Sequence, residues 1–144
     1  MSQRNVAAVQ LHERLYAAYN RHDLASVAEL YAQDATHEDV AHGRPKYGVN
    51  AIIEGLQRFL GWFPDAHWQP DIAIVDHNGL TAVPYLMTAS LQSQMGPIGP
   101  KGQKISLRGI HVLHLNDGLI QRSEDYWDSA TFQKQLTNNG EEKK

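Results

Sequence analysis

Apolar residues in the first part of the chain recur every three or four positions, which is the spacing of an amphipathic α-helix. This pattern predicts a first helix over residues 5–20. Asp23 is a good N-cap for a second helix, which ends near Asp34. Asn50 can cap a third helix, which ends at Gly61. The chain therefore begins with a helical hairpin followed by a separate helix.

From His67 onward the apolar residues alternate with a period of two, which indicates β-strands. Ile72 and Ile74 lie in one predicted strand, and residues 83–88 form the next. Pro84 should lie at a sheet edge or a bulge, because proline has no N–H group to donate to a strand ladder.

The last part of the chain predicts a long β-hairpin. Strands over residues 105–115 and 119–127 flank Asn116-Asp117-Gly118, which has the residue types of a tight turn. Residues 95–102 contain several glycines and prolines and are expected to form a loop before the hairpin. A short helix over residues 129–136 follows it.

The order of these elements predicts one α+β domain. Three N-terminal helices are wrapped by a curved, mostly antiparallel sheet, as a cone-shaped α+β barrel with a pocket inside. We expect the domain to span residues 1–137 and residues 138–144 to form a flexible tail.

Composition excludes several classes of function. The 144 residues contain no cysteine, so thiolate catalysis and thiolate metal ligation are excluded. No stretch approaches 18 consecutive apolar residues, so we expect no membrane segment and take the cytoplasm as the default location. With 13 basic residues, 16 acidic residues and no basic run beyond Lys143-Lys144, nucleic-acid binding is not indicated. Small molecules and other proteins remain as partners.

The predicted hairpin brings His111 and Asp125 onto neighbouring strands. If residues 116–118 form a three-residue turn, His111 lies opposite Ser123, and Asp125 lies diagonally from His111, about 7–8 Å away at the backbone. A two-residue turn would instead place Glu124 beside His111. A His–Asp pair on a sheet is either an acid–base pair or a structural ion pair, and spacing alone leaves both open.

An apolar pocket around such a carboxylate would raise its pKa towards neutrality, and an adjacent imidazole could donate a hydrogen bond to an enolate oxygen. The candidates for the wall of this pocket come from the first and third helices and from the hairpin. They are His12, Tyr16, Tyr19, Phe59, Trp62, Leu107 and Trp127.

The irregular segment predicted over residues 36–48 carries His37, Glu38, Asp39 and His42 close together. These are metal-ligand residue types, but they lack the spacing of a known metal motif, so no metal site is expected. The chain also lacks a glycine-rich phosphate loop and a GxSxG motif. We therefore expect no cofactor.

Several short segments together resemble one protein family in their order and spacing. They are Tyr19–Leu24, Leu30–Ala35, Phe63–Asp65, the glycine–proline loop before Gly102, Arg108–Val112, Asn116–Gly118 and Tyr126–Asp128. The chain resembles the SnoaL-like polyketide cyclases and ester cyclases, within the nuclear-transport-factor-2-like superfamily that also contains ketosteroid isomerase. The resemblance covers nearly the whole chain and implies a homodimer formed through the outer face of the sheet.

The resemblance also implies roles for individual residues. In SnoaL-like cyclases an aspartate near the end of the last strand is the acid–base catalyst of an intramolecular aldol ring closure, with a histidine on the preceding strand, and Asp125 and His111 match these positions. In ketosteroid isomerase the base follows the second helix, where Asp39 matches it. The tyrosine of the isomerase aligns near Leu15, so Tyr16 is expected to be rotated out of place.

These observations favour a cofactor-independent cyclase that acts on a small hydrophobic or aromatic polyketide ester. An isomerase-like proton-transfer enzyme and a non-catalytic binder of a hydrophobic ligand are the alternatives. A pocket without a convergent carboxylate would favour the binder.

Overall fold

The computed structural model describes residues 3–138, with side chains over residues 6–137. The described chain contains the helices α1 (Gln3–Arg21), α2 (Leu24–Glu29), α3 (Val49–Trp62) and α4 (Ser129–Asn138). Its strands are β1 (Tyr31–Asp39), β2 (Lys46–Tyr47), β3 (His67–Pro70), β4 (Ile74–Val75), β5 (Thr81–Ser90), β6 (Lys104–Asn116) and β7 (Leu119–Trp127). None of the described helices is long and apolar enough to cross a membrane. Of the tail predicted over residues 138–144, all but Asn138 lies outside the described residues.

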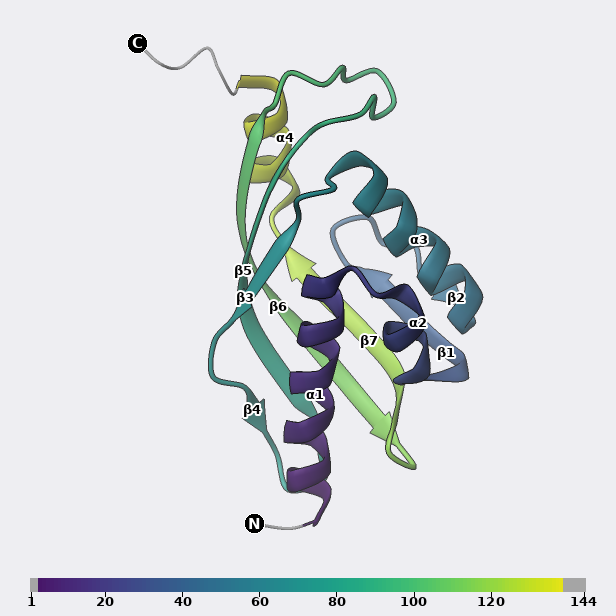
Figure 1. The fold of residues 1–144 in the computed structure, drawn as a ribbon. Coiled ribbons are helices and arrows are strands. Elements are labelled where there is room, and N and C mark those ends of the chain that lie inside the picture. Colours follow the sequence, from purple (N-terminus) through teal and green to yellow (C-terminus); the bar gives the residue numbers. More distant parts are fainter. Residues whose placement is uncertain (1–2, 139–144) are drawn as a thin grey trace.

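The strands form one curved sheet in the order β2-β1-β7-β6-β5-β3, and β4 pairs with β5. Helices α1, α2 and α3 lie against the concave face of this sheet, and α4 follows β7 (Figure 1). The predicted α+β class is confirmed. The sheet is open rather than a closed barrel, because β2 and β3 form its two edges.

The main error of the sequence prediction is β1. Residues 31–39 were expected to end a helix and begin an irregular segment, but they form a strand that pairs with β7 in parallel. Along β1 only Tyr31 and Ala35 are buried, four positions apart and with exposed polar residues between them, in the stretch where the register with β7 shifts. This spacing hides the period of two that would reveal a strand.

Three other local predictions are wrong. Helix α3 is capped by Gly48 at φ 91°, a backbone conformation that favours glycine, and not by Asn50. Ile72 and Ile74 do not form a half-buried strand, since they are 83% and 68% exposed. Pro84 lies neither at a sheet edge nor at a bulge, since β5 is an inner strand and its register with β6 is unbroken there. Its missing N–H group is tolerated because it falls in the gap between the pairing of β5 with β3 and with β4.

Two apolar clusters fill the space between the helices and the sheet. One includes Phe63, which is fully buried, and the other includes Leu15 and Leu113, which are also fully buried. Tyr19 and Leu56 pack against both clusters. Both residues also line the pocket described below, so the pocket lies where the two clusters meet.

Candidate active site

The pairing of β6 with β7 follows neither of the two registers considered from the sequence. Asn116 pairs with Leu119 across a two-residue turn, but the register then shifts because Gln121 is an extra residue in β7. This bulge moves the later residues of β7 by one position relative to β6. Asp125 therefore lies directly opposite His111, so their side chains share the inner face of the sheet.

The shifted register also determines the side-chain partners of Glu124 and Ser123, which precede Asp125 in β7. Glu124 is the alternative partner that a two-residue turn predicted for His111, but it pairs with Arg122 and His114 instead. Ser123 is fully buried, and its hydroxyl forms hydrogen bonds with Tyr31 and His37 at 2.9 Å and 2.7 Å. Ser123 thus links β7 to β1 beside the site.

A pocket of about 280 Å³ lies between the inner face of the sheet and helices α1 and α3. His111, Asp125 and Asp39 all line it. Of the seven residues predicted for its wall, six do so: Tyr16, Tyr19, Phe59, Trp62, Leu107 and Trp127. His12 is not one of the lining residues. His12 lies about one helical turn before Tyr16, roughly 6 Å further along the axis of α1. It is therefore beyond the pocket, although it shares a face of the helix with Tyr16.

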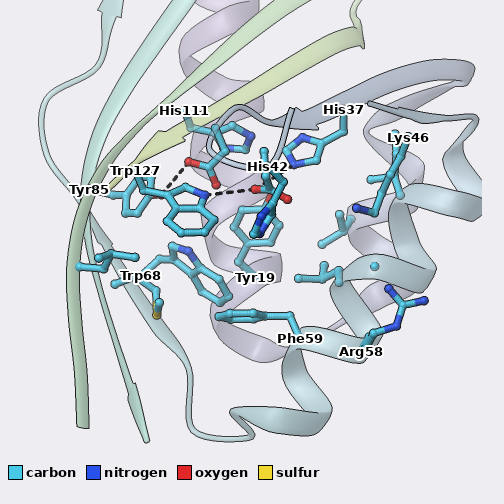
Figure 2. A pocket seen from close by; sticks show the side chains of 18 of the residues that line it. Tyr19, His37, His42, Lys46, Arg58, Phe59, Trp68, Tyr85, His111 and Trp127 are labelled. Atoms are coloured by element: carbon cyan, nitrogen blue, oxygen red, sulfur yellow. Dashed lines mark hydrogen bonds and ion pairs between the residues drawn. The ribbon is translucent and has the colours of Figure 1, made fainter. Parts of the chain in front are cut away.

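Asp125 is enclosed by protein at the wall of this pocket. The Tyr85 hydroxyl donates a hydrogen bond to Asp125 Oδ1 at 2.6 Å, one of the dashed contacts in Figure 2. Burial raises the pKa of Asp125 to about 7, and the nearby Asp39 adds to this rise. The hydrogen bond from Tyr85 acts in the opposite direction but does not cancel the effect of burial.

Asp39 lies beside Asp125, as its parallel neighbour on β1, but has the opposite electrostatic character. Burial alone would raise its pKa, yet contacts with His37 and Trp127 hold the pKa at about 2. His37 Nε2 lies 3.6 Å from Asp39 Oδ1, and Trp127 Nε1 donates to the same oxygen at 3.3 Å (Figure 2). At neutral pH, Asp39 is therefore a carboxylate, whereas Asp125 is close to the midpoint of its titration.

His111 contacts Tyr16 rather than Asp125. The Tyr16 hydroxyl lies 3.3 Å from His111 Nδ1, and no described residue partners His111 Nε2, which is buried. Burial, with a contribution from His37, lowers the pKa of His111 to about 3, so its imidazole is neutral. Tyr16 is not rotated away from the site, contrary to expectation, and the ring of Tyr19 stacks on His111.

The sequence did not identify Tyr85 as a site residue. Tyr85 on β5 pairs with Gly109 on β6, and its ring passes over Gly109 to reach Asp125 on β7. A Cβ atom at position 109 would lie 2.3 Å from the Tyr85 hydroxyl oxygen and 2.9 Å from the carbonyl oxygen of Tyr126. A glycine inside an otherwise apolar strand signals a close approach of this kind.

We expect Gly109→Ala to destabilise the domain by about 1–3 kcal/mol, because the added methyl group overpacks the strand. It should also displace Tyr85 from Asp125. Urea unfolding measures the first effect. Gly61→Ala is the matched control, since no atom lies within 4 Å of a Cβ atom at that position, and it should be neutral or slightly stabilising. Equal stability losses in both variants would contradict the predicted clash.

The segment that carries His37 and His42 contributes to the wall of this same pocket. His37 lies edge-on to His111, and His42 lies edge-on to Trp127, with ring centroids 5.9 Å and 5.2 Å apart. Within the described part of the chain, no group of three or more histidine or acidic side chains is arranged to hold a metal ion. His37, Asp39 and His42 are lining residues of the pocket.

Comparisons with solved structures find the same fold in other proteins. A candidate polyketide cyclase from Xanthomonas campestris pv. campestris is 22% identical, with a TM-score of 0.84 over 94% of this chain and 100% of that one. AclR, a candidate hydroxylase from Streptomyces galilaeus, is 20% identical, with a TM-score of 0.80 over 92% and 96% of the two chains. A candidate ketosteroid isomerase from Kribbella flavida is 19% identical, with a TM-score of 0.67 over 86% and 79%.

At these identities the likeness establishes the fold, and proteins with this fold differ in their named activities. No protein of curated function matches the chain. The family model for SnoaL-like polyketide cyclases matches residues 9–136, which is most of the chain. The chain therefore belongs to the SnoaL-like polyketide cyclase family.

Proposed function

We propose that the protein catalyses the intramolecular aldol-type ring closure of a polyketide ester, with Asp125 as the acid–base residue. One observation carries this proposal: Asp125 lines the pocket and its pKa is raised to about 7 by burial. A group with a pKa near the working pH both accepts and returns a proton efficiently. Asp39, with a pKa of about 2, is a much weaker base.

The reaction needs one proton to leave a carbon atom and return to an oxygen atom. The Asp125 carboxylate removes the proton from a carbon flanked by two carbonyl groups, which leaves an enolate. The enolate carbon then attacks a carbonyl carbon of the same molecule, which forms the new carbon–carbon bond and an alkoxide. The protonated Asp125 returns its proton to this alkoxide, so the enzyme ends in its starting state.

Tyr16 and His111 are suited to stabilising the enolate oxygen. A neutral imidazole carries one proton, and a proton on His111 Nδ1 would be donated to the Tyr16 oxygen. His111 Nε2 then keeps only a lone pair, which is less costly to bury without a partner than an N–H group. The Tyr16 hydroxyl is left free to donate to the substrate. In this scheme Tyr16 contacts the substrate and His111 positions Tyr16.

The position of Tyr16 also favours a second candidate function, which is isomerisation by proton transfer as in ketosteroid isomerase. In that function Asp39 would be the base and Tyr16 would bind the developing oxyanion. Both residues line the pocket. The low pKa of Asp39 makes this the weaker candidate, because a proton bound at Asp39 would be lost too readily.

A substrate assay separates these functions. The purified protein is incubated with anthraquinone β-keto esters and, separately, with a Δ5-ketosteroid, and the products are identified by chromatography and mass spectrometry. We expect ring-closed products of unchanged mass from the esters, formed equally well by Asp39→Asn. Steroid isomerisation that is lost in Asp39→Asn would instead support the isomerase, and binding without turnover of either class would support a ligand carrier.

We further propose that two copies of the chain pair through the outer face of the sheet. Ile110 and Tyr126 lie opposite each other on β6 and β7, and they are 44% and 46% exposed. Closed two-fold pairs are the commonest assembly of soluble proteins. Light scattering should give twice the chain mass of 16.2 kDa, and Ile110→Glu should give a monomer. A wild-type monomer at micromolar concentration would contradict the pairing.

A further inference from the structure

One side of the pocket carries positive charge that the proposed chemistry does not use. Lys46 and Arg58 line the pocket from β2 and α3, away from Tyr85 (Figure 2). His42, Arg44 and Lys46, together with Asp39, line a second hollow that shares Asp39, His42 and Lys46 with the pocket. Lys46 and Arg58 on the pocket wall and Arg44 in the second hollow are permanent cations, whereas the carboxyl groups of the pocket are those of Asp39 and Asp125.

These cations are available to a ligand. Among the described side chains, neither Lys46 nor Arg58 forms an ion pair. Lys46 contributes to the field that holds the pKa of Asp39 low, but the contacts of Asp39 within 4 Å are with His37 and Trp127. The charge of Asp39 is thus already balanced by its nearer contacts, and no carboxylate of a described residue lies within 4 Å of the Lys46 ammonium group.

The packing of α3 makes room for Lys46. A Cβ atom at Gly55 would lie 2.5 Å from Lys46 Cε, so the lysine side chain lies directly on the helix at this glycine. Glycine inside a helix is unfavourable by roughly 0.5–1 kcal/mol relative to alanine. Gly55 has an ordinary negative φ, so the backbone conformation does not require it. Because Gly55 has no side chain, it leaves space at the pocket wall, and the Lys46 side chain occupies that space.

The remainder of the pocket wall is aromatic and apolar. All three tryptophans of the chain, Trp62, Trp68 and Trp127, line it, together with Phe59. A volume of about 280 Å³ is at the small end of ligand pockets, so a ligand of a few fused rings fits best. A planar ring system among aromatic side chains and an anionic group at Lys46 and Arg58 would use both parts of the pocket.

We propose that the ligand of this pocket is a fused-ring aromatic carboxylate, whose carboxylate binds Lys46 and Arg58. The inference rests on the proposed function only in placing the ligand in the same pocket. It adds that the substrate carries a free carboxylate besides the ester and carbonyl groups that react. Lys46 and Arg58 are therefore specificity residues, because they select an anion over a neutral molecule of the same shape.

The test uses two probes of matched shape, 2-naphthoate and the neutral 2-naphthamide, at pH 8. Binding is followed by NMR titration of the three tryptophan indole N–H signals, which also locates the probe. Wild type should bind 2-naphthoate about tenfold or more tightly than 2-naphthamide, since a hydrogen bond to a charged group is worth about that factor. The preference should weaken as salt concentration rises.

Three variants test the assignment to Lys46. Lys46→Met should remove most of the preference by weakening naphthoate binding alone, and Lys46→Arg should retain it. Gly55→Ala keeps every charge but displaces the lysine, so it should lower the preference as well. Arg108→Gln, which removes an exposed cation from β6, is the control and should change nothing.

Equal binding of the two probes by wild type would overturn the inference. So would the absence of binding by both, or a Lys46→Met variant that weakens both equally. Failure of the proposed function looks different: naphthoate would still be preferred and would still require Lys46, while no ester would be converted to a ring-closed product. Asp125→Asn should keep the preference in either case, because the variant retains the cations.

Discussion

Asp125→Asn is expected to lower the rate of ring closure by about 10²–10⁴-fold while changing ligand affinity little. The size of the effect is that of removing a positioned general base, since an amide cannot accept the carbon-bound proton. The side chain keeps its shape, so the pocket and its aromatic wall are preserved. Turnover by wild type and variant is compared with affinity measured for the same substrate.

The pH dependence of the wild-type rate provides a second check. The base acts as a carboxylate, so kcat/KM should rise with pH and level off above about 7, the pKa to which burial raises Asp125. In Asp39→Asn, kcat/KM should still rise with pH to a plateau, because Asp39 is only one contributor to the raised pKa of Asp125. If Asp125→Asn converts a substrate as fast as wild type does, the assignment of Asp125 as the base is contradicted.

The second large effect is on stability. The pKa of Asp125 is about 7 in the folded protein, against an ordinary value of 3.8, so the folded state binds the proton more tightly than the unfolded state. The stabilisation is complete below about pH 4 and is lost as pH rises through 7. Between pH 5 and pH 8, wild type should lose on the order of 3 kcal/mol of unfolding free energy through this group.

Asp125→Asn should not show this loss, because an amide does not titrate. Urea unfolding at pH 5, 6, 7 and 8 measures the difference, and the stability of the variant relative to wild type should increase as pH rises. Asp117→Asn removes one carboxylate from the exposed turn and serves as the control for a change in overall charge. A difference between wild type and Asp125→Asn that stays constant with pH would mean that Asp125 is not buried in the way described.

The parts of the fold that depend on local patterns could be predicted from the sequence. Alternation along residues 105–115 correctly placed Leu107 and His111 on the inner face, and the turn residues correctly located the hairpin. The bulge at Gln121 could not be predicted, because no residue type marks it. It nevertheless decides that Asp125, rather than Glu124, is paired with His111.

The candidate site was predicted in part. Helical spacing along the first helix correctly brought Tyr16 and Tyr19 to the pocket, whereas Asp125 reaches it through a strand register that the sequence did not predict. Contacts between distant elements were missed, as in the case of Tyr85, whose hydroxyl crosses a whole strand to reach Asp125. Lys46 was missed for the same reason, since its place in the wall depends on a glycine of α3.

The place of β7 in the sheet also decides when this site can form. β7 lies between β6 and β1, and Asp125 is paired with Asp39, which precedes it by 86 residues. During synthesis on the ribosome β1 emerges long before its parallel partner. Until residues 119–127 emerge, one edge of β1 stays without its neighbour and is open to pairing with other chains. We expect nascent or truncated chains that stop before β7 to need more chaperone protection than chains that contain it.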